Sequence, residues 1–395
     1  MIEVRAAKEL GFAAERLERV GEGMQRYVDQ NKVAGIVTLV ARRGSVVHFE
    51  KFGQQDLASG KPMALDTIFR IYSMTKPIAS VALMMLFEHG LVRLTDPVSE
   101  YIPAFKDLQV YVDEDERADL ERAITVYDLM THTAGFSYGD YATTQMPVDK
   151  LYDQAELWSS HITNQDMVRR IAALPLANQP GRLWQYSVAT NVIGYLVEVI
   201  SGMSLGEFFE EKIFKPLGMQ DTAFNVLPQA LDRLATLYGL TENGPLEVLD
   251  PDPWAYDYVH TRLQYAGGGL VSTAADYLRF AQMVLNGGEL DGARLLGRKT
   301  VELMTINHLP PALLATLEPP PGWGFGLGFG VAMDVAQLGM MGSVGQHGWS
   351  GMAETDFWID PQEQLIGILL LQYMPFGAHP IASDFKTLVY QALVD

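Results

Sequence analysis

The sequence predicts an α+β fold in which an antiparallel sheet, flanked by terminal helices, is interrupted by an inserted all-helical domain. Two observations predict it: strand-like patterns occur near both ends of the chain, and helical patterns fill the middle and occupy both termini. Because a sheet must bury its apolar face against another layer, strands from the two ends are expected to join in one sheet. We therefore expect residues 1–72 and 255–395 to form a discontinuous sheet domain, residues 73–254 to form a mostly helical domain, and the active site to lie in the cleft between them.

The N-terminal region combines a helical pattern with a hairpin pattern. In residues 13–30, apolar residues recur every three or four positions, as in an amphipathic helix. Residues 36–53 are rich in β-branched residues and predict two strands that turn at Arg43 and Gly44.

The middle and C-terminal parts differ in periodicity. Four helices are predicted in the middle, at residues 125–132, 164–174, 190–202 and 205–214. Short strands and a final helix are predicted near the C-terminus, at residues 324–334, 343–351, 353–360, 363–374 and 381–393. The longest apolar run, Ile366 to Leu371, is far shorter than the ~20 residues that span a bilayer and fits a buried strand.

Composition excludes several classes of function. Lys and Arg number 29 against 48 Asp and Glu, a net charge of −19 that repels nucleic acids and anionic membranes. The absence of cysteine excludes disulfides, cysteine nucleophiles and thiolate metal sites. The histidines form no H-E-x-x-H pattern and no close pair, so we expect no metal and no other cofactor. The N-terminus lacks a basic-then-apolar signal, so a cytoplasmic location is expected.

A G-x-S-x-G pattern occurs at Gly135 to Gly139, with Ser137 at its centre. As a nucleophile motif it requires a buried strand before it and a helix after it. The preceding residues are polar and end a predicted helix, and the following residues begin no apolar helix. Ser137 is therefore not expected to be a nucleophile.

A second serine motif is Ser73-Met74-Thr75-Lys76, an S-x-x-K pattern. The i, i+3 spacing places both functional side chains on one face of a helix, and Pro77 is tolerated only in a first turn, so the helix should begin near Ser73. Ser73 then lies at the positive end of the helix dipole, where backbone N–H groups can stabilise an oxyanion. The dipole and burial predict a lowered pKa for Lys76. The motif predicts a serine nucleophile beside an amine base.

Two further segments fit the same chemistry. Tyr186 lies directly before a predicted helix, where its side chain can point into a cleft. Residues 348–352 lie in a predicted strand, and glycine in a strand often marks close approach of the backbone to a ligand.

In this order the motifs resemble the serine β-lactamase and penicillin-binding protein superfamily, most closely the class C β-lactamases and the family VIII carboxylesterases. The resemblance covers residues 15–390, and the family fold agrees with the split sheet expected above. The S-x-x-K motif, the Y-A-N or Y-S-N motif and the K-T-G or H-T-G strand fall on Ser73 to Lys76, Tyr186-Ser187-Val188 and Trp349-Ser350-Gly351.

The resemblance implies a mechanism. Ser73 would form an acyl-enzyme, with Lys76 and Tyr186 as base and proton relay, and which of the two is the primary base stays open. The backbone N–H groups of Ser73 and Met352 would form the oxyanion hole.

Two positions depart from the lactamase pattern. Val188 replaces the asparagine that contacts a β-lactam side chain, and Trp349 replaces the cation that meets the lactam carboxylate. Burying a carboxylate without a partner is costly, although His347 could still supply a cation. We therefore expect a serine carboxylesterase that hydrolyses short-chain, uncharged acyl esters. The expected substrate-binding residues are Tyr138, Val188, Trp349, Ser350 and Gly351.

Three alternatives remain: a β-lactamase or D-alanyl-D-alanine peptidase, an acyltransferase that uses the same acyl-enzyme, and a catalytically silent binding module. The intact serine, lysine and tyrosine set argues against the silent module. The sequence does not define an oligomeric state. The aromatic residues that could line an apolar pocket are Tyr138, Tyr141, Trp158, Trp254, Tyr256 and Trp323.

Overall fold

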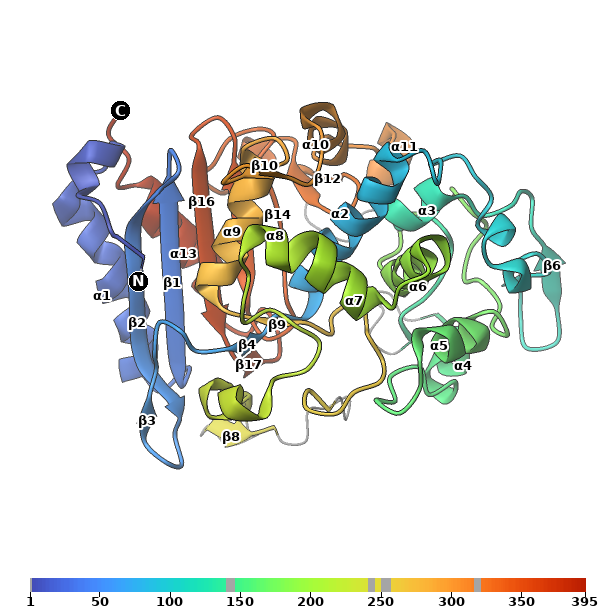
Figure 1. The fold of residues 1–395 in the computed structure, drawn as a ribbon, viewed down its shortest axis with the longest axis horizontal. Helices are drawn as coiled ribbons and strands as arrows, with labels where there is room; N and C mark the ends of the chain where they lie inside the picture. Colours follow the sequence, from blue (N-terminus) through green and yellow to red (C-terminus); the bar gives the residue numbers. More distant parts are fainter. Residues whose placement is uncertain (1, 140–145, 241–245, 250–256, 316–320) are drawn as a thin grey trace.

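An eight-stranded antiparallel sheet forms one side of the molecule, and its strands come from both ends of the chain (Figure 1). The computed structural model describes residues 2–139, 146–240, 246–249, 257–315 and 321–395. The strand order is β12-β13-β14-β15-β16-β1-β2-β3. The strands are β1 (Gly35–Arg42), β2 (Ser45–Asp56), β3 (Lys61–Pro62), β12 (Trp323–Phe325), β13 (Gly330–Ala332), β14 (His347–Ser350), β15 (Asp356–Asp360) and β16 (Leu365–Leu371). The expected fold class is confirmed.

The central strands β1 and β16 are buried on both faces of the sheet. Successive side chains of a strand point to opposite faces. Val37 and Leu39 therefore join the core between the sheet and the middle of the chain, whereas Ile36 and Val40 join the core under the terminal helices. A strand buried on both faces needs apolar residues at every position, which explains the uninterrupted run at 366–371.

Terminal helices cover one face of the sheet, and a helix from late in the chain covers the other (Figure 1). Helices α1 (Ala14–Asp29) and α13 (Ile381–Tyr390) pack against each other on the first face. Helix α9 (Ala274–Leu285), which the sequence analysis did not assign, contacts β16, β1 and β15 on the second. The β1–β2 hairpin turns at Arg43 and Gly44 with φ values of 52° and 75°, as in the type I′ turns that suit twisted hairpins.

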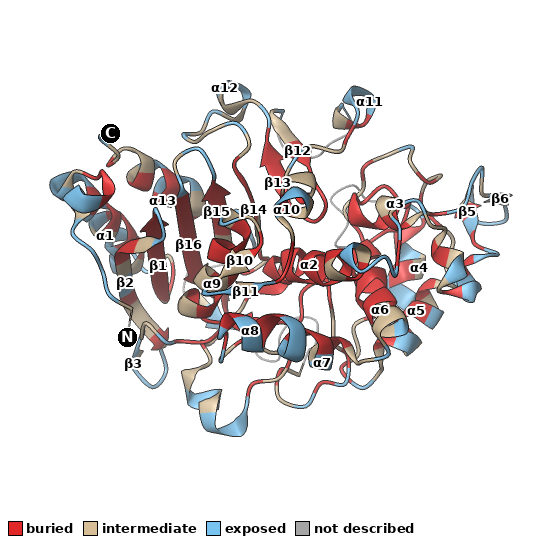
Figure 2. Cartoon of the chain, turned by 45° about the horizontal axis from the view of Figure 1, so that its top comes forward, coloured by how far each residue is buried: buried red, intermediate tan, exposed pale blue. Residues whose placement is uncertain are grey.

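The middle of the chain is mostly helical, and the four helices predicted there are present. Its helices are α2 (Thr75–Glu88), α3 (Val126–Met130), α4 (Asp149–Gln154), α5 (Asn164–Ile171), α6 (Ala189–Ser201), α7 (Leu205–Phe209), a π-helical segment (Glu210–Phe214) and α8 (Lys215–Leu217). A short hairpin, β5 (Gln109–Tyr111) with β6 (Arg117–Asp119), adds strand to this region. Figure 2 shows α2 buried along its length, as expected of a helix that is apolar on all sides.

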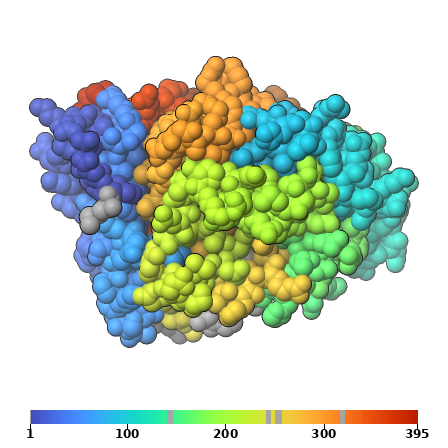
Figure 3. Space-filling view, in the orientation of Figure 1, coloured from blue at the N-terminus to red at the C-terminus, as the bar shows by residue number. Residues whose placement is uncertain are grey.

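The remaining elements are short. They are β4 (Phe69–Arg70), β7 (Tyr238–Leu240), β8 (Leu246–Val248), β9 (Val271–Ser272), β10 (Glu289–Leu290), β11 (Ala293–Arg294), β17 (Tyr373–Met374), α10 (Arg298–Met304), α11 (Pro311–Leu314), α12 (Val335–Leu338) and 3₁₀ turns at Ala7–Leu10, Tyr72–Met74, Val98–Glu100, Pro103–Phe105 and Pro228–Arg233. In the space-filling view the blue N-terminal and red C-terminal residues lie together on one side and the cyan part of the middle lies on the opposite side, while the yellow-green part reaches the blue residues (Figure 3). Residues 254 and 255, where the domain boundary is expected, both lie outside the described residues, and the division into two domains stays a prediction.

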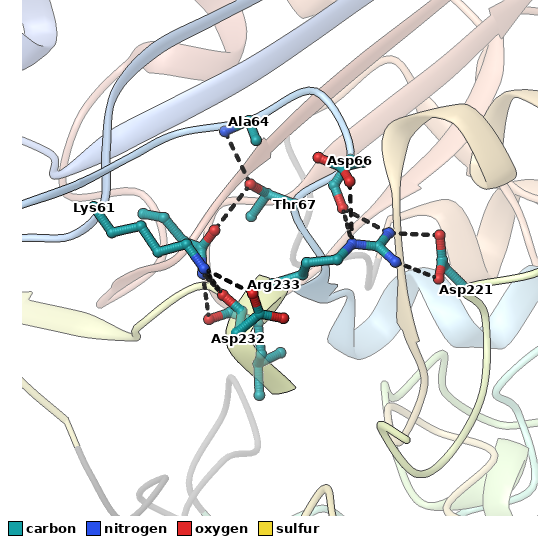
Figure 4. A network of polar contacts seen from close by, with 9 residues as sticks. Lys61, Ala64, Asp66, Thr67, Asp221, Asp232 and Arg233 are labelled. Atoms are coloured by element: carbon teal, nitrogen blue, oxygen red, sulfur yellow. Dashed lines mark hydrogen bonds and ion pairs between the residues drawn. The ribbon is translucent and has the colours of Figure 1, made fainter. Parts of the chain in front are cut away.

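A surface network joins the N-terminal part of the chain to the segment after α8 (Figure 4). The Arg233 guanidinium donates to both carboxylate oxygens of Asp221, at 2.9 and 2.6 Å, and to the backbone oxygen of Asp66. Lys61 pairs with Asp232 in the same network. Exposed pairs contribute little stability individually, so the network mainly fixes how the two segments lie.

Within the described ranges, no single helix is long and apolar enough to cross a membrane. One pair of helical segments, Ala189–Ser201 and Leu205–Leu217, meets the criteria of length and composition together, with a bend of 80° between them.

Candidate active site

Ser73 lies in a sharp turn between strand β4 and helix α2. Tyr72, directly before it, has a φ of 43°, a left-handed conformation that is costly for a bulky residue and is typical of functional sites. Pro77 is the third residue of α2, within the first turn, where its missing N–H has no intrahelical partner. The predicted helix start is confirmed, and Ser73 sits at the N-terminal end of a buried helix.

Lys76 is 2% exposed and points at Ser73. Its Nζ lies 3.0 Å from Ser73 Oγ and donates a hydrogen bond to the backbone oxygen of Gly267 at 2.5 Å. Burial lowers the pKa of the Lys76 ammonium well below its ordinary value. The structure therefore places a lysine that favours the neutral form beside the serine hydroxyl.

Gly267 allows this close approach of the backbone to Lys76. A Cβ at this position would lie 2.2 Å from Asn191 Oδ1 and 2.9 Å from the Tyr138 hydroxyl, so no larger residue fits without movement. The three consecutive glycines at 267–269 were the available sequence signal, but only the fold reveals their contact with Lys76.

Tyr186 completes the cluster from the segment just before α6. Its hydroxyl is hydrogen-bonded to Ser73 and accepts a hydrogen bond from Trp349 Nε1–H at 3.1 Å. The Lys76 Nζ lies 4.6 Å from the centre of its ring. Burial raises the pKa of Tyr186 to about 12, so the phenol is protonated at neutral pH.

Strand β14 and the turn after it form the wall beside Ser73. Gly351 N–H donates to the Thr355 carbonyl at 2.6 Å, and a Cβ on Gly351 would lie 2.4 Å from the backbone oxygen of Ile71. Glycine therefore lets β14 pack against the turn that carries Ser73. Met352 follows immediately and lines the same cavity as Ser73.

The cavity beside Ser73 is predominantly aromatic. Its lining residues are Tyr72, Ser73, Tyr138, Trp158, Tyr186, Tyr258, Tyr265, Gly267, Gly268 and Met352. The Trp158 ring packs against Tyr138 and Tyr265, whose hydroxyls are 3.1 Å apart. None of these described lining residues carries a formal charge at neutral pH, so the cavity suits an apolar, uncharged group.

The expected pocket aromatics divide into three groups. Tyr138 and Trp158 line the cavity, and Trp323 is in β12 outside its lining. Tyr141, Trp254 and Tyr256 lie outside the described residues. The sequence analysis missed Tyr72, Tyr258 and Tyr265 as lining residues, because no local pattern distinguishes them from packing residues.

Not every expected substrate-binding residue reaches the cavity. Val188 is fully buried in the core at the N-cap of α6, and Ser350 donates to the half-buried carboxylate of Asp356 at 2.7 Å. Trp349 contacts Tyr186 and does not line the cavity itself. Burial lowers the pKa of His347 to about 4, so His347 is neutral at neutral pH and supplies no cation.

Ser137 has a structural environment. It is fully buried, donates to the Asp149 carboxylate and accepts the Gly139 N–H at 3.0 Å. Ser137 is also not among the described residues that line the cavity, and its engaged hydroxyl is consistent with the expectation that it is no nucleophile. In the part of the chain that the structure describes, no group of three His, Asp or Glu side chains could hold a metal ion.

The fold and this cluster define a serine hydrolase, and comparison with known proteins agrees. The chain belongs to the β-lactamase family, whose model matches residues 20–391. Protein Rv1367c of Mycobacterium tuberculosis is 34% identical over 366 residues, which cover 88% of each protein. Esterase EstB of Burkholderia gladioli is 28% identical over 395 residues, covering 96% of each. A similar solved structure is EstCE1, a hydrolase with promiscuous acyltransferase activity, with a TM-score of 0.82 and 26% identity over 95% of this chain and 99% of that one.

Proposed function

We propose that this hydrolase is a serine carboxylesterase that cleaves short-chain, uncharged acyl esters through an acyl-enzyme on Ser73. The observation that carries the proposal is the contact of Ser73 with both the Lys76 amine and the Tyr186 phenol beside an uncharged aromatic cavity. The esterase EstB and the hydrolase EstCE1, both similar over nearly the whole chain, support it.

Lys76 is the base for the first step. Its neutral amine has a lone pair, and the Ser73 hydroxyl, 3.0 Å away, can donate its proton to that lone pair as Oγ attacks the ester carbonyl. The hydrogen bond from Nζ to Gly267 leaves the lone pair free to face Ser73. The Ser73 and Met352 N–H groups would bind the oxyanion. The loss of one such donor typically raises the activation barrier by about 3–4 kcal/mol.

Tyr186 then returns a proton to the leaving alcohol. Its phenol is protonated at neutral pH and cannot serve as the resting base, which favours Lys76 in that role. The Trp349 indole donates to the phenol oxygen, so the phenol proton is free to point toward Ser73 and the leaving group. For deacylation the same groups act in reverse on a water molecule, which releases the acid and restores Ser73.

Tyr186→Phe isolates this proton transfer. The substitution keeps the ring and its packing and removes only the hydroxyl. We expect kcat to fall at least ~100-fold, the lower end of the range for acid–base catalysis. Stopped-flow hydrolysis of an ester with a poor leaving group measures it, and an unchanged kcat would reduce Tyr186 to a packing residue.

The cavity disfavours β-lactams for a physical reason. A β-lactam brings a carboxylate, and burying this charge without a partner costs more than the ~1–3 kcal/mol of an unpaired neutral polar group. Trp349 stands where the related lactam enzymes have a cation, His347 is neutral, and Val188 is buried in the core. The similarity to EstCE1, a hydrolase with promiscuous acyltransferase activity, also favours a second activity, which is transfer of the same acyl group to an alcohol in place of water.

A substrate panel tests the proposed function. On one preparation, kcat/KM is measured for p-nitrophenyl acetate, butyrate and octanoate and for a chromogenic cephalosporin. We expect the short esters to be cleaved well and the cephalosporin poorly or not at all. Comparable values for butyrate and cephalosporin would overturn the esterase assignment in favour of a lactamase. An added primary alcohol shows, by product partition, whether acyl transfer competes with hydrolysis.

A further inference from the structure

His132 lies under Tyr186 and takes no part in the mechanism above. It follows α3, is 2% exposed and has a φ of 54°, a left-handed conformation that histidine and asparagine adopt more readily than most residues. The centre of its ring is 5.0 Å from the centre of the Tyr186 ring, and Trp184 and Phe325 pack at its edges.

His132 accepts hydrogen bonds from the two residues on either side of Tyr186. Its backbone oxygen accepts the Gln185 N–H at 2.9 Å, and its ring Nδ1 accepts the Ser187 N–H at 3.3 Å. One residue therefore holds the backbone directly before and directly after the catalytic tyrosine.

The contacts also define the form of the ring. Because Nδ1 accepts a backbone N–H, it carries no proton, and the ring proton sits on Nε2, 3.4 Å from Thr190 Oγ1. Burial lowers the pKa of His132 to about 3. The ring is neutral wherever the enzyme works, so His132 is neither a base nor a cation.

We propose that His132 is a positioning residue for Tyr186, which holds the phenol where it can protonate the leaving alcohol. The inference rests on the proposed ester hydrolysis. The Tyr186 hydroxyl must stay within reach of both Ser73 and Trp349, and its backbone lies in a segment outside any helix or strand. The two hydrogen bonds to His132 supply the rigidity that regular secondary structure would otherwise provide.

A comparison of two esters with different leaving groups shows whether His132 positions Tyr186 or only packs against it. p-Nitrophenolate leaves without help, whereas an alkoxide needs a proton from Tyr186. His132→Asn keeps an acceptor at the position of Nδ1 and tolerates the left-handed backbone. His132→Leu has nearly the shape of asparagine but lacks the acceptor, and it also adds strain to the left-handed backbone at this position. The measurement is kcat/KM, which reports acylation, for p-nitrophenyl butyrate and for ethyl butyrate with wild type and both variants.

We expect the kcat/KM of His132→Leu to fall about 30-fold more on ethyl butyrate than on p-nitrophenyl butyrate, because a positioned general acid accelerates a reaction by about 10²–10⁴-fold. For His132→Asn, the ratio of kcat/KM on the two esters should stay within about 3-fold of the wild-type ratio. Equal losses on both esters, or a ratio that asparagine fails to preserve, would overturn the inference. If the leucine variant does not fold, His132→Gln takes its place. Its acceptor lies one bond farther along the side chain, at the position of Nε2, which faces Thr190 and not the Ser187 N–H. Behaviour of this variant equal to that of asparagine would contradict the proposal. A wild type that cleaves neither ester would instead refute the proposed function itself.

Discussion

Ser73→Ala is expected to abolish ester hydrolysis while leaving the fold intact. The hydroxyl is the only group that the proposed mechanism makes a nucleophile, and its loss leaves Lys76 and Tyr186 without an atom to activate. Residues that act as a unit are not additive, so the alanine variant should fall to the rate of the remaining binding and oxyanion groups, at least about 10⁴-fold below wild type. Initial rates with p-nitrophenyl butyrate measure the loss.

A labelling experiment identifies the nucleophile directly. A fluorophosphonate should add to one serine, and peptide mass spectrometry should place the adduct on Ser73. Ser137→Ala is the matched control, since Ser137 centres the G-x-S-x-G pattern but is buried with its hydroxyl bonded to Asp149. The control should keep most of the activity and the label. An adduct on Ser137, or loss of activity in a folded Ser137→Ala, would refute the assignment.

The sequence predicted those parts of the fold and site that depend on local pattern. The start of α2 near Ser73 followed from the place of Pro77 and the i, i+3 spacing, and the buried strand β16 followed from its apolar run. Residues 343–351 and 353–360 were predicted as consecutive strands, and the structure pairs β14 with β15 in these ranges. Each of these features is set by neighbours within a few residues.

Features that depend on distant contacts were not predictable in this way. Tyr265 and Gly267 lie about 190 residues from Lys76, as in the hydrogen bond between Lys76 and Gly267 that spans 191 positions. Val188 was expected at the substrate because of its place in a motif, but its side chain packs in the core. The left-handed turn at Tyr72 also left no local mark, because a bulky residue is a poor predictor of positive φ.

The second large loss of activity is expected from substitution of Lys76. Lys76→Met has a side chain of similar length without the amine, so the Ser73 proton has no acceptor. We therefore expect kcat/KM to fall about 10³-fold, which is within the range of general base catalysis. In the wild type the base is the neutral amine, and burial lowers its pKa. Activity should therefore fall as pH decreases through that lowered pKa and stay level as pH rises toward the ordinary lysine value. A pH–rate profile in which activity rises only as pH approaches the ordinary lysine value of about 10.4 would count against a lysine base of lowered pKa.

The same buried amine links activity to stability, and the sign of the link can be tested. In the unfolded chain the Lys76 ammonium keeps its proton up to a pH of about 10.4, whereas the native amine releases it at lower pH. Between these two values the unfolded state binds more protons, so this residue makes the free energy of unfolding rise with pH. Lys76→Met removes this pH-dependent contribution to the free energy of unfolding. It also removes the hydrogen bond to the Gly267 carbonyl, a loss that does not depend on pH. Denaturant unfolding of both proteins at several pH values should therefore show the wild type gaining on the methionine variant as pH rises toward 10. A constant difference would mean that Lys76 keeps an ordinary pKa, and a permanently charged lysine could not take the proton from Ser73.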